Sequence, residues 1–270
     1  MIHEFHFQRE GIVDINAAVV GISRSRWTAV ASTDASTEHA QKIMKANGFD
    51  VLPIDDGQRV REYFNTQDWG VYTSIEQKPI TYRDVISYQT PIRDVIKVFV
   101  AEKRNFYFLE SENRIVGLVT VGNLNYRQVQ IYLFSLFCEL ETAMAAYLSS
   151  LMSQDEIRNA FSQSQSPKLS EVERRYKKDQ KRGVDAPYVE YLYFSDLIRL
   201  LAPKQWAQLE ISPARQTALK ELKEWRNRIA HPTMSLIRKP ENVEALWHSL
   251  DSVEEILFQL RHSVEAGQVK

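Results

Sequence analysis

Three residues near the end of one expected helix carry groups suited to chemistry at a phosphate. Arg226 is a permanent cation, Asn227 is a neutral hydrogen-bonding amide, and His231 carries an imidazole that titrates near neutral pH. A guanidinium can stabilise charge that develops on a phosphate, and an imidazole can transfer protons at pH 7. The pattern therefore favours acid–base chemistry on a phosphodiester.

The helix expected over residues Pro213–Ala230 positions these groups. Its apolar positions include Leu222 and Ile229, and Arg226 stands between them where the packing pattern calls for an aliphatic side chain. A guanidinium buried without a partner would be strongly unfavourable, so Arg226 needs either an anionic partner or a wet cleft. A structural salt bridge with a glutamate on a facing helix is the alternative to a catalytic role.

His231 immediately precedes Pro232, and a residue before proline is biased out of helical geometry. The imidazole is therefore expected at the C-terminal end of the helix, where the helix dipole favours its protonated form. Taken alone, a capping histidine is the simpler interpretation of this residue. Its proximity in sequence to Arg226 favours a joint role.

The pattern Arg-Asn-x-x-x-His, on the penultimate long helix of the C-terminal part, resembles the HEPN family. Many members of that family are metal-independent ribonucleases, and the resemblance extends over residues 124–262. It implies that Arg226 contacts the scissile phosphate, that Asn227 orients the site and that His231 is the catalytic imidazole. It also implies an RNA substrate, no cofactor for catalysis, and a homodimer whose motif helices face each other.

The residue types fit this chemistry because RNA supplies its own nucleophile. The 2′-hydroxyl attacks the neighbouring phosphate, so the enzyme needs a proton-transfer group and cationic donors but no metal. Arg226 and His231 provide both. DNA lacks the hydroxyl and is expected to resist cleavage.

The first 123 residues follow a different pattern, in which short strands alternate with short helices. Helices are expected over 36–47, closed by Gly48, and over 90–101; strands are expected over 27–32, 49–54, 106–109 and 114–120. The order strand, helix, strand, strand occurs twice, which predicts a tandem α/β module.

The segment Gly117–Leu124 is similar to the closing motif of CBS domains, which pair in tandem and often bind adenine nucleotides. The resemblance implies that Thr120 contacts phosphate and that Asn123, where the family usually has Asp, binds ribose hydroxyls. It also implies that Thr90 and Ile92 cradle the base through backbone groups. AMP, ADP or ATP is the expected regulatory ligand.

The first copy departs from this motif. The segment Glu62–Asp68 keeps the acidic residue at the right offset from Asn65 but lacks the glycine and the threonine. The alternative interpretation is a dimerising scaffold with an empty cleft.

The remainder of the chain is expected to be an all-α bundle of four helices. These helices are expected near 124–152, 188–201, 213–230 and 242–262. The polar segment Ser162–Ala186 between them is expected to be a basic linker. It is either an RNA-backbone contact or, more simply, a solvated loop.

Composition limits the class of protein. With 34 Lys and Arg against 35 Asp and Glu, net charge does not recruit nucleic acid or an anionic membrane. The only cysteine, Cys138, excludes an intrachain disulfide and, with the polar N-terminus, favours the cytoplasm. The most apolar stretch contains Glu139 and Glu141, so a buried helix is expected there and not a membrane span.

Together these features predict an α+β protein. A tandem CBS-like module is expected over 1–123 and a HEPN-like helical domain over 124–270. The expected function is a metal-independent endoribonuclease regulated by adenine nucleotide. Two alternatives remain open: a non-catalytic nucleotide-binding scaffold, and an RNA-binding module that does not cleave.

Overall fold

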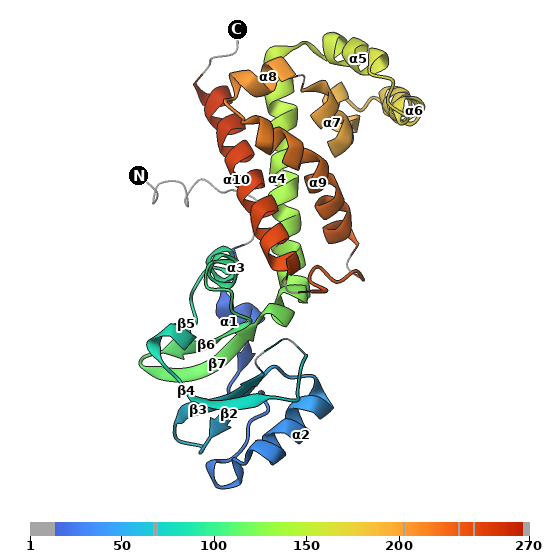
Figure 1. Ribbon diagram of the computed structural model, residues 1–270. Helices are drawn as coiled ribbons and strands as arrows, with labels where there is room; N and C mark the ends of the chain where they lie inside the picture. The colour runs from blue at the N-terminus through green and yellow to red at the C-terminus, as the bar shows by residue number, and fades with distance from the viewer. Residues whose placement is uncertain are drawn as a thin grey trace. The chain divides into compact units, whose positions relative to one another are not determined.

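The computed structural model describes residues 14–66, 68, 70–201, 203–231, 233–239 and 241–266. The chain is a mixed α+β protein, as predicted, with two small sheets. It divides into two compact units (Figure 1). The α/β unit contains residues 14–132 and 233–247, and the helical unit contains residues 133–231 and 248–266.

Up to Asn125, the α/β unit contains short helices and short strands. Its elements are α1 (Ala17–Val20), β1 (Ile22–Ser23), η2 (Ser32–Asp34), α2 (Thr37–Asn47), β2 (Val51–Asp55), β3 (Val60–Thr66), β4 (Ile75–Pro79), η3 (Tyr82–Asp84), β5 (Val85–Ser87), α3 (Ile92–Ala101), β6 (Phe106–Ser111), β7 (Arg114–Thr120) and η4 (Val121–Asn125).

The predicted tandem order of helix, strand and strand is present in both halves of this unit, as α2-β2-β3 and as α3-β6-β7. The Ser36 hydroxyl caps α2 by accepting from the backbone N–H of His39, and Gly48 ends the helix at φ 70°. Lys103 takes φ 50° two residues after α3 ends. The predicted strand over 27–32 is wrong, because only Val30 forms a bridge there, to Ile54, before η2 begins.

Side-chain alternation along the strands builds two cores. The sheets have the orders β1-β7-β6-β5 and β2-β3-β4. On β2 and β3, Leu52 and Phe64 pack with residues of α2 on one face, while Val51 and Tyr63 pack against the other sheet. Tyr63 lies edge-to-face with Phe106 from β6, with ring centroids 5.2 Å apart. Aromatic contacts therefore join the two repeats.

The α/β unit extends beyond its predicted end at residue 123. The Asn125 side chain donates to the Ile237 carbonyl at 2.9 Å and accepts from the Ile237 N–H at 2.8 Å. The Gln130 amide donates to the carbonyl of Met234 at 3.1 Å. These bonds hold the segment 233–247 in this unit, which spacing along the sequence does not indicate.

The helical unit contains more helices than predicted. Its elements, with those that continue from the α/β unit, are α4 (Arg127–Leu151), α5 (Gln154–Gln163), α6 (Leu169–Gln180), η5 (Tyr188–Tyr191), α7 (Phe194–Leu200), α8 (Pro203–Gln208), α9 (Pro213–Ala230) and α10 (Glu241–Glu265). The prediction of four helices is wrong in number, because α5, α6 and α8 are additional helices. The predicted helix over 188–201 breaks at Leu192 into η5 and α7.

Two ion pairs join α4 to its neighbours in this unit. Arg226 of α9 donates from Nε to Glu141 Oε1 at 3.0 Å, and Arg261 of α10 pairs with Glu139. Figure 1 shows α4 between α9 and α10. The predicted apolar seam of α10 is confirmed, because all six of its positions are buried: Val243, Leu246, Leu250, Val253, Leu257 and Leu260.

By length and composition α4 is apolar enough to cross a membrane. Half of its apolar window, 50%, is nevertheless buried inside the protein. With Glu139 and Glu141 each paired to an arginine, the helix is compatible with a packed element of a soluble protein. The N-terminal residues used in the sequence argument lie outside the described residues.

A buried carboxylate organises the contact between the two repeats. Asp84 is 4% exposed and accepts hydrogen bonds from the Thr81 N–H at 2.7 Å, the Thr81 hydroxyl at 2.6 Å and Arg104 at 2.5 Å. Burial alone would raise the pKa of Asp84, but the bonds from Thr81 and Arg104 outweigh it, so its pKa lies below the ordinary value.

We expect Asp84→Ala to lower the free energy of unfolding by about 2–4 kcal/mol, because it leaves Arg104 without its partner. A lowered pKa in the folded state contributes stability above the unfolded-state pKa near 4, and this contribution is lost as the pH falls through the folded-state pKa. Chemical denaturation between pH 3 and 7 should therefore show that acid lowers the free energy of unfolding less in the variant than in the wild type. Glu38→Ala, which removes an exposed i,i+4 pair, is the control with little effect. Equal stability losses in the two variants would contradict the assignment.

Candidate functional site

A cleft of about 400 Å³ in the α/β unit contains two of the residues chosen from the sequence, Thr120 and Asn123. Its wall also includes Arg26, Trp27 and Asn105. This volume lies in the range of small-molecule sites, which span roughly 300–1,000 Å³. The cleft is therefore large enough for a nucleoside or a nucleotide.

Thr120 and Asn123 are held as a pair where β7 ends and η4 begins. The Asn123 side-chain oxygen accepts from the Thr120 N–H at 2.7 Å and from the Thr120 hydroxyl at 3.1 Å. Asn123 is only 3% exposed, and the Val121 N–H donates to the Asn105 carbonyl at 2.9 Å. This capping box fixes both side chains before any ligand enters.

The other lining residues add an aromatic ring and charge. Trp27 lies edge-on to Phe108, with centroids 6.3 Å apart, and Arg26 supplies a cation. Asp50, also in the wall, accepts from the Gly70 N–H at 2.8 Å and from the Thr66 hydroxyl at 3.3 Å. An aromatic ring beside a cation suits a ligand with a flat heterocycle and an anionic group.

The structure does not bring Thr90 and Ile92 to this cleft. The Thr90 carbonyl accepts from the Ala17 N–H at 2.8 Å, and the Ile92 N–H donates to the Ile15 carbonyl at 2.9 Å. Ile92 is also 1% exposed. The backbone groups expected to cradle a base are thus used to hold the start of α3 against residues 15–17.

A second cleft of about 420 Å³ includes Asn65, which occupies the place of Thr120 in the first repeat. Lys78, Lys103 and Arg104 give it a basic lining, and the buried side-chain oxygen of Asn65 has no hydrogen-bond partner among the described residues. The first-repeat motif also includes Asp68, which is exposed, and Gln67, which lies outside the described residues.

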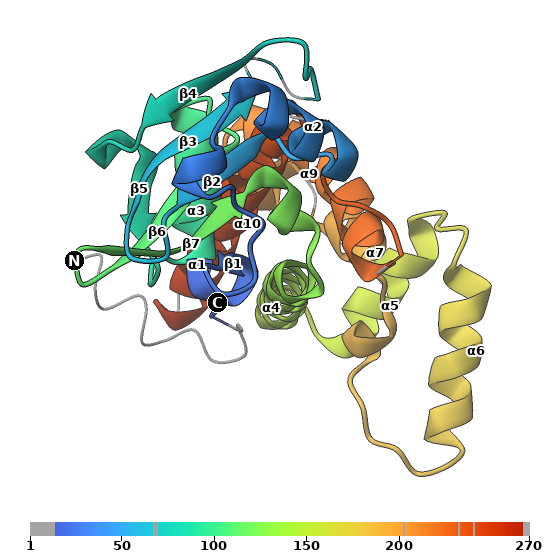
Figure 2. The same cartoon turned by 90° about the horizontal axis from the view of Figure 1, so that it is seen from below.

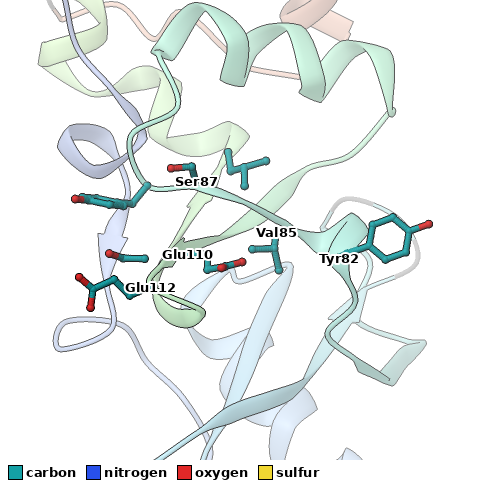
Figure 3. A pocket seen from close by; sticks show the side chains of 8 residues that line it. Tyr82, Val85, Ser87, Glu110 and Glu112 are labelled. Carbon is teal, nitrogen blue, oxygen red and sulfur yellow. The ribbon is translucent and has the colours of Figure 1, made fainter.

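A third hollow, of about 430 Å³, lies along β5 and the end of β6. Figure 3 shows Glu110 and Glu112 on one side of it, with Tyr82 projecting away from the other labelled side chains. Tyr82 is 83% exposed. The residues that we selected from the sequence do not line this hollow.

The second candidate site, at the C-terminal end of α9, lies in the helical unit. Arg226 is partly exposed and pairs with Glu141 of α4, so the anionic partner that its position requires is present. This ion pair is common to a structural and to a catalytic role of Arg226. Asn227 and His231 are exposed, and His231 directly follows the last residue of α9. Because consecutive helical residues differ by about 100° in direction, Arg226 faces α4 while Asn227 does not.

Sequence reasoning missed Glu141 as part of this site. The signal was present, because two carboxylates in the middle of an apolar helix each require a cation. Cys138 lies one turn before Glu141 on α4, and the charges of Glu141 and Arg226 both affect the pKa of its thiol. Burial and the Glu141 carboxylate raise the pKa of the Cys138 thiol, and the Arg226 guanidinium partly offsets this rise.

No protein-family model matches the chain, and no curated protein sequence matches it either. The functional interpretation therefore depends on the short motifs and on the geometry of these two sites.

The Cys138 thiol provides a test of the geometry around Arg226. We expect alkylation of Cys138 to follow a pH midpoint above that of an ordinary thiol. Arg226→Gln should move the midpoint further up, and Glu141→Gln should move it down, as measured by iodoacetamide labelling and mass spectrometry. Lys223→Gln, at an exposed position of α9, is the control for loss of a surface charge. Midpoints that do not respond to either Arg226 or Glu141 would show that the two charges are not close to the thiol.

Proposed function

We propose that the protein is a metal-independent endoribonuclease of HEPN type whose activity responds to an adenine nucleotide bound by a CBS-like tandem module. One observation carries the proposal furthest. Thr120 and Asn123, selected from a sequence motif, line the same cleft of about 400 Å³ as Trp27 and Arg26. The cleft thus combines groups suited to each part of a nucleotide.

Each part of the nucleotide has a candidate partner. Trp27 offers a ring on which adenine can stack, and Arg26 offers a cation for phosphate. The Asn123 oxygen already accepts two hydrogen bonds from Thr120, so its amide nitrogen is the group that donates to a ribose hydroxyl. Thr120 would contact phosphate through its hydroxyl, whose hydrogen would turn from the Asn123 oxygen to a phosphate oxygen.

We expect ATP, ADP or AMP to raise the melting temperature, because a ligand that binds only the folded state stabilises it by about 2.7 kcal/mol at one hundred times its Kd. Thr120→Val and Asn123→Ala should each remove most of this shift, measured against the variant's own melting temperature without ligand. Ser87→Ala, in the hollow along β5, should keep it. A full shift in both cleft variants, or none in the wild type, would contradict nucleotide binding at this cleft.

The cleavage half of the proposal rests on Arg226, Asn227 and His231. The contact with Glu141 uses Nε of Arg226, and guanidinium has further N–H groups on its terminal nitrogens that suit a phosphate. His231 is exposed at the helix end, where a polynucleotide can reach it. Asn227, the next residue after Arg226, would orient the RNA. In a homodimer, a second copy would bring a second set of these groups.

The reaction proceeds by internal transfer on RNA. The 2′-oxygen attacks phosphorus while its proton passes to a base, and the bond from phosphorus to the 5′-oxygen breaks as that oxygen gains a proton. The products are a 2′,3′-cyclic phosphate and a 5′-hydroxyl end. His231 performs proton transfer in this scheme, and Arg226 stabilises the charge on the phosphoryl oxygens.

We expect the protein to cut RNA in the presence of a chelator and to leave DNA of the same sequence intact. His231→Ala and Arg226→Ala should each slow single-turnover cleavage by about 10²–10⁴-fold, whereas Lys223→Ala on the same helix should not. Adenine nucleotide should change the rate by about 5–150-fold in the wild type, as coupled sites do, and not in Thr120→Val. Gel analysis of end-labelled RNA reports all of these rates.

The outcomes separate the proposal from its alternatives. Cleavage that survives both substitutions would place the chemistry elsewhere. RNA binding without cleavage would favour a binding module. Nucleotide binding with neither RNA binding nor cleavage would favour the scaffold, for which the ion pair between Arg226 and Glu141 would be purely structural.

A further inference from the structure

The helix α6 and the turn after it carry a group of exposed cations beside carboxylates that already have partners. The segment around it was expected to be a loop, but residues 169–180 form a regular helix at the outer edge of the helical unit (Figure 2). Both acidic and basic residues are frequent in this helix. What distinguishes it is that its carboxylates have hydrogen-bond or ion-pair partners, whereas several cations of the helix and the turn after it have none among the described residues.

The acidic side chains of α6 are held in contacts within the unit. Glu173 accepts two hydrogen bonds from Arg158, at 2.9 and 2.6 Å, and one from the Tyr188 hydroxyl at 3.0 Å. Tyr193 donates to Glu171 at 2.6 Å, and Tyr191 donates to Asp179 at 3.3 Å. These carboxylates are therefore occupied, and they fix α6 to the segment that contains η5.

The tyrosines of that segment are occupied as well. Tyr188 and Tyr191 are buried, and the guanidinium of Arg175 lies over the Tyr191 and Tyr193 rings at 5.8 and 5.9 Å from their centroids. The nearby Phe194 is buried as well. These rings are not available to stack on bases.

Four basic side chains of α6 and the turn after it differ from Arg175 and Lys177, which contact the tyrosine rings and Glu173. Arg174, Lys178, Lys181 and Arg182 are all exposed, and we call them the basic ridge. Arg174 and Lys178 lie one turn apart on α6, and Lys181 and Arg182 lie in the turn directly after its last residue, Gln180. Eight residues at the helical rise span about 12 Å. Lys178, Lys181 and Arg182 form no ion pair with any described residue.

We propose that the basic ridge binds the sugar–phosphate backbone of RNA. The inference rests on the proposed ribonuclease function, for which it supplies a surface that holds the substrate. Four cations over about 12 Å match roughly three or four phosphates of one strand, at 3.4 Å each along a helix axis. With the nearby tyrosines occupied, contacts are to phosphates alone and recognition is independent of base sequence.

An anionic membrane fits the ridge less well. A helix that lies in a membrane interface inserts an apolar face beside its cations. The apolar residue Val172 of α6 is fully buried in the unit, at 0% exposure, and the ridge itself is entirely cationic. Electrostatic attraction to a polyanion needs no such apolar face.

The test measures RNA affinity in the full-length chain carrying His231→Ala, so that RNA is not cut. A single-stranded RNA oligonucleotide is titrated at several salt concentrations, with and without neutralisation of the ridge by Arg174→Gln, Lys178→Gln, Lys181→Gln and Arg182→Gln. Each lost phosphate contact should reduce the slope of log affinity against log salt by about 0.7. We expect a total reduction of about two to three and an affinity at least about tenfold weaker at low salt.

The matched control removes the same charge from exposed positions of the α/β unit. Lys45→Gln, Arg59→Gln, Arg61→Gln and Lys97→Gln together change net charge equally, and all four residues belong to the other compact unit. This control should keep at least most of the RNA affinity and slope. Circular dichroism melting of both variants excludes unfolding as the cause, because cations at a helix C-terminus also stabilise the helix.

The outcomes distinguish this inference from the proposed function. If the ridge variant binds RNA with the wild-type slope while the active chain still cleaves RNA, the ridge proposal is overturned and the nuclease stands. If binding depends on the ridge but the active chain never cleaves, the ridge proposal holds and the nuclease fails. Ridge-dependent binding to phosphatidylserine vesicles, without ridge-dependent binding to RNA, would overturn the RNA assignment in favour of a membrane.

Discussion

The arrangement of the helical unit depends on two carboxylates placed in the middle of an apolar helix. Glu139 and Glu141 lie on α4 among buried residues such as Leu136, Leu140 and Met144. A carboxylate in such a position is costly unless a cation reaches it. Arg261 and Arg226 meet this requirement from α10 and α9. The two ion pairs therefore join α10 and α9 to α4 and direct the Arg226 side chain toward α4, while buried apolar residues supply the packing.

Helices and strands were predicted with accurate bounds where capping or turn residues mark their ends. The helix ended by Gly48 and the helix Pro213–Ala230 were predicted at or within a residue of their observed bounds, as was the strand Arg114–Thr120. Ser36 and Gly48 illustrate the reason, because each satisfies backbone groups within its own helix end. Such interactions are encoded by a few consecutive residues.

The predictions were wrong for segments whose structure depends on contacts with residues far away in sequence. The segment over 162–186 is too polar to indicate packing, but α6 forms because Arg158, Tyr188 and Tyr193 supply partners for its carboxylates. The return of residues 233–247 to the α/β unit depends on Asn125 and Gln130, more than one hundred positions away in sequence. For the candidate sites, Thr120 and Asn123 share a cleft as expected, whereas Thr90 and Ile92 are used by pairing with residues 15–17.

Comparing the two ion pairs on α4 shows how much the pairing says about the role of Arg226. In both, the arginine side chain is about equally exposed, at 31% for Arg226 and 30% for Arg261. Partly exposed pairs of this kind contribute little to stability, with a typical value of about 0–1 kcal/mol for surface pairs. Ion-pair geometry alone therefore does not distinguish a catalytic arginine from a structural one. What sets Arg226 apart is its place in the sequence, because the exposed Asn227 and His231 follow it within five residues at the same helix end. The case for cleavage thus rests on a combination of three residues, and each of them must contribute for the argument to hold.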